Sequence, residues 1–355
     1  MSNAEKILEV RDLTISFNTY AGKVQAVRGI NFDLHKGETF AIVGESGSGK
    51  TVSTRALIGL LAHTAVIEKG TAMYKGRDLV QLTEKDWEKL RGREIAMIFQ
   101  DPLSSLNPIK KIGKQISEIF TLQHKLPEAE AKERSLGLMR SVGIPLPDKR
   151  YNQYPFQFSG GMRQRIVIAI ALASNPEILI CDEPTTALDV TIQAQVLALI
   201  MKLQRERNLT TIFITHDLGV VAHVADRIAV MYAGRIVEYG TAEDVFYNPQ
   251  HPYTWSLMAS MPDMDIEVGE ELMVIQGAPP NMMFPPPGDA FAERNTHALK
   301  LDFTEEPPMF KVSDTHYAAT WLLHPSAPRV ERPAPLERRI RNSLKRKAEA
   351  QSGGL

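Results

Sequence analysis

The stretch that decides the fold is Gly44-Glu45-Ser46-Gly47-Ser48-Gly49-Lys50-Thr51. It follows a short apolar run, Thr39 to Val43, and it precedes a helical pattern from Lys50 to Leu61. A strand, a glycine-rich turn and a helix in this order match the phosphate-loop pattern in full. The glycines let backbone N–H groups turn toward phosphate oxygens, and the start of the helix favours anions. We therefore predict a site for nucleotide phosphates rather than an ordinary glycine-rich turn.

Two kinds of side chain complete the expected chemistry of this loop. Lys50 is expected to reach the β- and γ-phosphates, and Thr51 to offer its hydroxyl to Mg²⁺. A second strand-like run, Ile178 to Cys181, ends in Asp182 and Glu183. Asp182 is placed to hold Mg²⁺, and Glu183 to take a proton from an attacking water. The alternative is a strand that ends in a solvated acidic turn, which the upstream phosphate loop disfavours.

Composition excludes several other classes of protein. The chain has 355 residues, with 41 Lys and Arg against 42 Asp and Glu. This balance argues against a bulk nucleic-acid binder, which carries an excess of basic charge. Cys181 is the single cysteine, so an intrachain disulfide and a cysteine-only metal site are excluded. We find no secretory signal, and no apolar run reaches the roughly 18 residues that span a bilayer.

The order of patterns along the chain predicts several parts. Strand-like runs alternate with helical ones over residues 1–250, which indicates an α/β parallel sheet. Within it, residues 101–175 have helical character and are predicted to be an inserted helical subdomain. Residues 251–335 contain proline pairs and triplets, which indicate a small, loop-rich domain. Residues 336–355 are basic and predict a flexible tail, for which a contact with anionic lipid is an alternative role.

Further motifs resemble a known family. Ser159-Gly160-Gly161-Met162 begins a helix and resembles the signature motif of ABC-type ATPases, whose usual form is LSGGQ. Six stretches together resemble the ATPases of oligopeptide and dipeptide importers: GESGSGKT, FQDPLSSLNP, SGGMRQR, CDEPTTALDVTIQAQ, THDLGVVA and NPQHPYTWSL. The resemblance implies a P-loop ATPase with a RecA-like core, an antiparallel β subdomain and a helical subdomain. A C-terminal domain of the oligopeptide-transporter type would follow.

The same resemblance implies roles for residues outside the phosphate loop. Ser159, Gly160 and Gly161 would contact the γ-phosphate of ATP held by the opposite protomer. Gln100 would sense the γ-phosphate and Mg²⁺, and His216 would be the switch histidine that contacts the γ-phosphate. Ala187-Leu188-Asp189 resembles the D-loop, which crosses the dimer interface.

One adenine contact is also implied by the resemblance. Phe17 is the candidate aromatic that stacks on the adenine ring. Tyr20 is its rival, and a plain core position for Phe17 is the other interpretation.

The resemblance also implies partners and a location. This chain would be the ATP-hydrolysing subunit of a peptide importer and would use ATP and Mg²⁺. A second, distinct ATPase would form a heterodimer with it on the cytoplasmic face of the membrane. Two permease subunits and an external peptide-binding lipoprotein would complete the transporter.

Three alternatives remain open at this stage. A nickel or other small-solute importer would use a similar ATPase. A non-transport ABC ATPase would carry long coiled-coil or zinc-bearing insertions, and neither occurs in this sequence. A regulatory cassette that binds ATP without hydrolysis would lack Glu183 or His216, and both are present.

One departure from the family pattern concerns metal. Many relatives carry four C-terminal cysteines that can hold an iron–sulfur cluster, whereas Asp289 and Asn295 occupy two of these positions here. We therefore expect no iron–sulfur cluster. His297, His316 and His324 are interpreted as scattered surface histidines rather than as metal ligands.

Overall fold

A mixed eight-stranded sheet forms the centre of the molecule. The computed structural model describes residues 5–186, 188–261 and 275–352. The strand order in this sheet is β11-β12-β10-β9-β3-β8-β7-β6. Five neighbouring strands run parallel: β6 (Ile95–Ile98), β7 (Ile178–Asp182), β8 (Thr210–Thr215), β3 (Thr39–Val43) and β9 (Arg227–Tyr232). Every residue of β3, β7 and β8 is buried, as expected for parallel strands covered on both faces. The α/β class predicted from the sequence is confirmed.

A second, antiparallel sheet packs against this core. Its order is β2-β1-β4-β5, with β2 (Gly22–His35), β1 (Lys6–Thr19), β4 (Ala65–Tyr74) and β5 (Arg77–Asp78). Side chains from both sheets and from α1 (Lys50–Ala56) and α2 (Glu84–Leu90) share one apolar cluster, which includes Phe32, Phe40 and Trp87. This cluster fixes the antiparallel sheet beside the start of α1.

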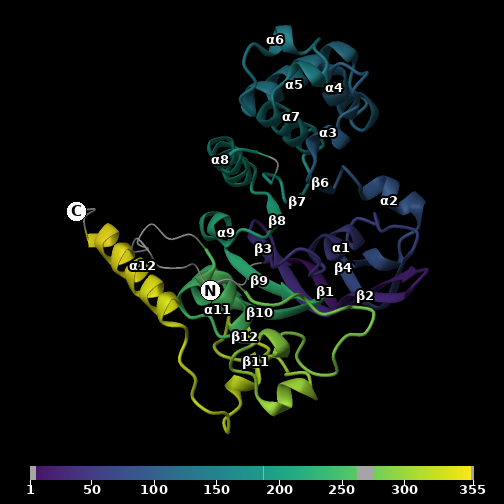
Figure 1. Cartoon of the computed structure of the whole chain (residues 1–355). Helices are drawn as coiled ribbons and strands as arrows, with labels where there is room; N and C mark the ends of the chain where they lie inside the picture. Colours follow the sequence, from purple (N-terminus) through teal and green to yellow (C-terminus); the bar gives the residue numbers. More distant parts are fainter. Residues whose placement is uncertain (1–4, 187, 262–274, 353–355) are drawn as a thin grey trace.

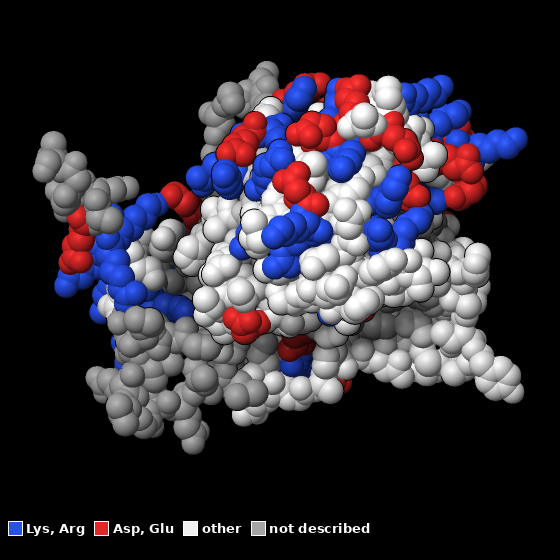
Figure 2. All heavy atoms as spheres, turned by 90° about the horizontal axis from the view of Figure 1, so that it is seen from above, with Lys and Arg blue, Asp and Glu red and all other residues white. Residues whose placement is uncertain are grey.

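The helical stretch forms a separate group at the top of Figure 1. It contains α3 (Pro102–Ser105), α4 (Ile112–Leu122), α5 (Glu128–Ser141), α6 (Pro147–Arg150) and α7 (Gly160–Leu172). A second apolar cluster joins these helices to β6, β7 and α8 (Val190–Arg207). Figure 2 views the molecule from above, and on this face acidic and basic side chains are interspersed rather than separated by sign.

The C-terminal region returns to the edge of the central sheet. After α9 (Leu218–Val224), the chain forms β10 (Arg235–Thr241), α10 (Ala242–Tyr247) and α11 (Pro252–Ala259). Further along, β11 (Phe310–Lys311) and β12 (Tyr317–Ala318) extend the sheet beyond β10. The interpretation of His316 as a surface residue is wrong, because its buried Nε2 lies 2.8 Å from Oε1 of buried Glu238 on β10.

The basic end differs from the predicted flexible tail over the part of it that is described. Residues Ala334–Ser352 form the helix α12 (Figure 1). Leu336 and Ile340 are buried in the apolar cluster that also contains Trp255 and Met258 of α11. These two apolar side chains, four residues apart, give the helix one buried stripe, which composition alone did not reveal. Figure 2 shows Lys and Arg side chains gathered along this helix at the left of the view.

Asp289 and Asn295 each accept a hydrogen bond from the backbone N–H two residues further along the chain. Asp289 Oδ1 accepts from the backbone N–H of Phe291, and Asn295 Oδ1 accepts from that of His297, both at 3.0 Å. Among the described residues, no three His, Cys, Asp or Glu side chains are grouped for a metal ion. Nor does any described helix combine the length and apolarity needed to cross a membrane.

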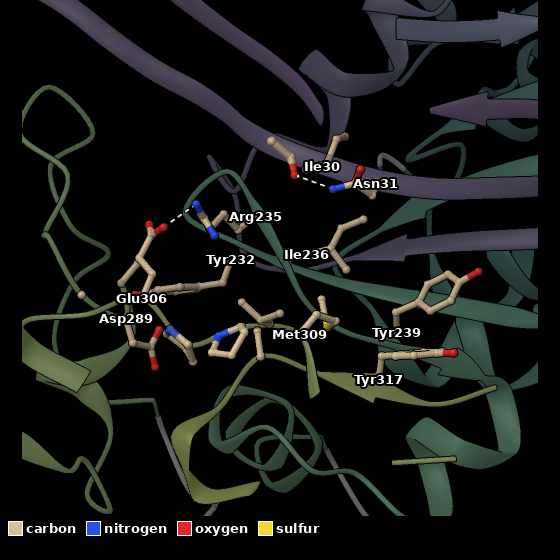
Figure 3. Close-up of a pocket in the computed structure, with 17 residues that line it drawn as sticks. Ile30, Asn31, Tyr232, Arg235, Ile236, Tyr239, Asp289, Glu306, Met309 and Tyr317 are labelled. Atoms are coloured by element: carbon tan, nitrogen blue, oxygen red, sulfur yellow. Dashed lines mark hydrogen bonds and ion pairs between the residues drawn. The ribbon is translucent and has the colours of Figure 1, made fainter. Parts of the chain in front are cut away.

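A cavity of about 330 Å³ lies between β10 and the segment that contains Pro307 and Pro308 (Figure 3). At one end Glu306 forms ion pairs with Arg28 and Arg235, which ties the C-terminal region to β2 and β10. Asp289 lies near Glu306 (Figure 3). Burial raises the pKa of the Asp289 carboxyl to about 6, and repulsion by Glu306 adds to the effect.

This carboxyl predicts a pH-dependent gain in stability for Asp289→Asn. The raised pKa means that the folded protein favours the neutral carboxyl. The stability that Asp289 contributes is therefore fully present below pH 3.8, the ordinary pKa, and is lost as pH rises through about 6. Asparagine removes the ionisable group while its oxygen still accepts from Phe291. Urea unfolding should show Asp289→Asn more stable than the parent at pH 8, by up to about 3 kcal/mol, and equal to it near pH 4. An equal gain at both pH values would contradict this account.

Candidate nucleotide site

The phosphate loop is held between β3 and α1 by close backbone approaches. Gly44 and Gly49 have φ values of 154° and 101°, which favour glycine. A Cβ at Gly44 would lie 2.0 Å from the carbonyl oxygen of Met231, and one at Gly49 would lie 2.4 Å from that of Ala26. The loop is therefore pressed against β9 on one side and β2 on the other.

Lys50 lies beneath this loop and is 4% exposed. Its Nζ donates to the carbonyl oxygens of Gly44, at 2.7 Å, and Glu45, at 2.8 Å. Burial lowers the pKa of Lys50, against the opposing attraction of Glu183, Asp182 and Glu45. The hydroxyl of Ser48 is buried without a hydrogen-bond partner. A buried ammonium beside an unpaired hydroxyl suits an anionic ligand.

Thr51 and Asp182 form the adjoining part of the site. The Thr51 hydroxyl donates to Asp182 Oδ1 at 2.8 Å, which joins the start of α1 to the end of β7. Asp182 is 2% exposed, and burial raises the pKa of its carboxyl. A hydroxyl and a carboxylate are oxygen donors of the kind that Mg²⁺ takes, and a cation would offset the cost of burying the charge. These two residues therefore fit a magnesium ion.

The Glu183 carboxylate is in contact with side chains that follow the two strands on either side of β7. Gln100 Nε2 donates to Glu183 Oε2 at 3.1 Å, and His216 Nδ1 lies 3.3 Å from Glu183 Oε1. Gln100 follows β6, Glu183 follows β7 and His216 follows β8, so neighbouring parallel strands end at one edge of the sheet. Ligands of open α/β sheets bind outside this edge. The structure thus brings together three residues that the sequence predicted separately.

The backbone of Glu183 adopts an unusual conformation. Its φ of 45° is left-handed, which costs about 1–3 kcal/mol for a residue with a side chain and is typical of functional sites. The Thr186 hydroxyl donates to Glu183 Oε2 at 3.0 Å. Sequence reasoning missed Thr186, although a hydroxyl three residues after a turn glutamate is within reach of its carboxylate.

The signature motif is not part of this cluster. Ser159 precedes α7 and accepts from the backbone N–H of Met162 at 3.4 Å, which caps the helix. Ser159 and Gly160 are exposed, and Gly161 packs closely against Ile192 of α8. In Figure 1, α7 lies in the helical group, away from α1.

The remaining predicted contacts are partly described. Asp189 is exposed and caps α8 by accepting from Ile192 N–H at 3.0 Å, while Ala187 lies outside the described residues. Phe17 is half-buried on β1 opposite Val24 and Ala65, whereas Tyr20 is fully exposed. The adenine and D-loop roles stay predictions.

Comparisons with known proteins agree with this fold. Residues 27–186 match the family model described as ABC transporter, and residues 237–300 match that for the C-terminal region of oligopeptide/dipeptide transporters. A dimeric ATP-binding cassette in a post-hydrolysis state, bound to ADP and Pi, is 25% identical, with a TM-score of 0.60 over 66% of this chain and 98% of its own. A component of an ABC transporter complex from Clostridium perfringens is 29% identical, with a TM-score of 0.59 over 69% of this chain and 92% of its own. Fold and site define an ABC-type P-loop ATPase.

Curated relatives narrow the class further. The oligopeptide transport ATP-binding protein OppD of Bacillus subtilis is 58% identical, covering 96% of both chains. The dipeptide transport ATP-binding protein DppD of Lactococcus lactis is 59% identical, covering 92% of this chain and 93% of its own. This chain belongs to the family of oligopeptide and dipeptide transport ATP-binding proteins, which confirms the resemblance seen in the sequence.

The close packing of Gly49 yields a prediction. Gly49→Ala should weaken ATP binding about tenfold or more, because the new Cβ meets the Ala26 carbonyl and the loop must shift. Calorimetric titration with ATP measures this effect. Gly137→Ala in α5 is the matched control, since its Cβ would meet nothing within 4 Å. The control should bind ATP normally and gain up to about 1 kcal/mol in stability. Unchanged ATP binding by Gly49→Ala would contradict the assigned loop.

Proposed function

We propose that this chain is the ATP-hydrolysing subunit that powers import of oligopeptides or dipeptides through a membrane permease. The observation that carries the proposal is the convergence of Gln100, Thr186 and His216 on the Glu183 carboxylate. Glu183 is the next residue after Asp182, and the Asp182 carboxylate accepts a hydrogen bond from Thr51 of the phosphate loop. Membership of the peptide-transport family supports the choice of cargo.

The phosphate loop and Lys50 bind the triphosphate. Lys50 has three N–H donors, of which the two carbonyl oxygens take two, and its positive charge offsets that of the β- and γ-phosphates. Thr51 and Asp182 hold Mg²⁺, which neutralises charge that develops on the phosphate oxygens. The Ser48 hydroxyl, which has no hydrogen-bond partner within the protein, donates to the triphosphate as well.

Glu183 is the general base for the attacking water. Its carboxylate takes the proton as the water attacks the γ-phosphorus. Gln100 and His216 orient the carboxylate in the described arrangement. Thr186 restrains the same side chain.

Ser159, Gly160 and Gly161 act on the ATP of a partner ATPase. The exposure of Ser159 and Gly160, and the place of α7 in the helical group away from α1, support a closed dimer, with ATP between the loop of one protomer and the signature motif of the other. Exposed Asp189 lies on the dimer interface. A distinct second ATPase, two permease subunits and an external peptide-binding lipoprotein complete the transporter. This chain sits peripherally on the cytoplasmic face of the membrane.

The permease contact lies on the segment that begins at Gln100 and includes α3. Leu103 and Ile109 are 58% and 85% exposed, which is high for large apolar residues and suits a protein interface. Asp101 caps α3 by accepting from Leu103 N–H at 2.8 Å. The segment also carries Gln100, so permease and nucleotide site share one loop.

Glu183→Gln should bind ATP but hydrolyse it about 10²–10⁴-fold more slowly, because glutamine keeps the shape and cannot accept the proton. Turnover should be measured in the assembled complex, with nucleotide counted at each site, because the partner's own site can remain active. Glu133→Gln, at an exposed position of α5, is the control and should hydrolyse ATP normally. Parent-like hydrolysis at this chain's site would show that Glu183 is not the base.

Leu103→Ser combined with Ile109→Ser should keep ATP binding and reduce copurification with the permease. The reason is loss of apolar area from the proposed contact. Leu122→Ser, which removes another exposed leucine of the helical group, is the control and should copurify normally. Full copurification of the double variant would place the permease contact elsewhere.

A further inference from the structure

A partly buried ion pair joins the C-terminal region to the phosphate loop. Arg294 ends a short 3-10 helix (Ala292–Arg294), and its side chain is 5% exposed. Its Nη1 donates to Glu45 Oε2 at 2.7 Å, and its Nη2 donates to Glu45 Oε1 at 2.9 Å. Two parallel bonds between a guanidinium and a carboxylate fix both position and orientation. Glu45 is the second residue of the phosphate loop, so this contact reaches the nucleotide site directly.

The rest of the Arg294 side chain is held as firmly. Its Nη1 also donates to the Tyr232 hydroxyl at 3.0 Å, and its Nε donates to the carbonyl oxygen of Gln276 at 2.9 Å. The guanidinium lies 5.7 Å from the ring centre of Tyr232 and 5.8 Å from that of Phe291. Figure 3 shows the Tyr232 ring directed toward the C-terminal segment that carries Asp289. These contacts hold the guanidinium of Arg294 with its fork toward Glu45.

The backbone of Glu45 is anchored from the same side. Its N–H donates to the hydroxyl of Tyr253 on α11 at 2.8 Å. The Tyr253 ring packs against that of Tyr232, with centres 4.5 Å apart. Both the side chain and the amide of Glu45 are thus bonded to residues that lie outside the loop, while its carbonyl oxygen accepts from Lys50.

The charge on Glu45 gives this contact a consequence for ATP. Its carboxylate belongs to the loop that is to hold a triphosphate, and a free anion there would repel the ligand. The Arg294 guanidinium cancels that charge. The pair is only partly exposed on the Glu45 side, so water screens it weakly.

We propose that Arg294 is a positioning residue of the phosphate loop, which neutralises Glu45 and thereby lets the C-terminal region set the affinity for ATP. The inference rests on the ATP site proposed above. It assigns part of that site to the region after β10, which the sequence predicted only as a small, loop-rich domain. A simple staple between two parts of the fold is the competing role, and it makes a different prediction when both charges are removed.

The test is a rescue experiment on the full chain. Each protein also carries Glu183→Gln, so that ATP is not consumed during calorimetric titration with ATP and Mg²⁺. Arg294→Gln should weaken ATP binding about tenfold, because it leaves an unpaired carboxylate in the loop. Adding Glu45→Gln to Arg294→Gln should restore affinity to within about threefold of the parent, because the repelling charge is gone.

Controls separate charge from folding. Arg134→Gln breaks an exposed arginine ion pair with Glu130 in α5 and should leave ATP affinity unchanged. Thermal unfolding without nucleotide measures the stability of each variant independently of ATP. Should Arg294→Gln fail to fold, Arg294→Lys keeps the charge opposite Glu45 although it loses the paired bonds of the fork, so its ATP affinity should fall by less than about tenfold.

Three results would overturn the inference. The first is parent-like affinity in Arg294→Gln. The second is a double variant that binds as weakly as Arg294→Gln, which is the result expected of a staple. The third is a tenfold loss in a folded Arg294→Lys. A failure of the proposed function looks different, because the parent would then not bind ATP, or Lys50→Ala would bind it equally well.

Discussion

The contact on which the rest of the site depends is that of the Lys50 ammonium with the carbonyl oxygens of Gly44 and Glu45. It closes the phosphate loop on itself. A buried ammonium needs such partners, because burial disfavours its charged form. The surrounding structure holds the loop in place: β9 and β2 press on its glycines, and Arg294 and Tyr253 hold Glu45. The backbone of the loop is therefore fixed from several sides by the surrounding structure.

The parallel sheet explains why residues far apart in sequence meet beside this loop. Neighbouring strands β6, β7 and β8 end at the same edge, and each is followed within two residues by Gln100, Glu183 or His216. Every residue in β7 and β8 is buried, so packing on both faces supports these strand ends. This packing offsets the strain in the backbone of Glu183. The carboxylate of Glu183 then faces its three partners, Gln100, Thr186 and His216.

Much of this could be predicted from the sequence, because short motifs encode local backbone geometry. The phosphate loop, the strand before Asp182 and the capped start of α7 at Ser159 are of this kind. Contacts that depend on tertiary pairing were not predicted. The strands β11 and β12 are only two residues long and exist because β10 offers an edge. Arg294 and Glu45 are 249 positions apart, so no local pattern marks their pairing. His316 and α12 were misjudged for the same reason, since burial against β10 and α11 decides both.

The most direct test of the central claim is a structure of the assembled transporter with Mg²⁺ and a non-hydrolysable ATP analogue. The account predicts the analogue's phosphates inside the loop 44–51, with Lys50 on the β- and γ-phosphates and Mg²⁺ on Thr51 and Asp182. It also predicts Glu183 facing the γ-phosphate, and a signature motif from the partner ATPase on its far side. A nucleotide bound with its phosphates outside the loop, or with Glu183 turned away from the γ-phosphate, would contradict it.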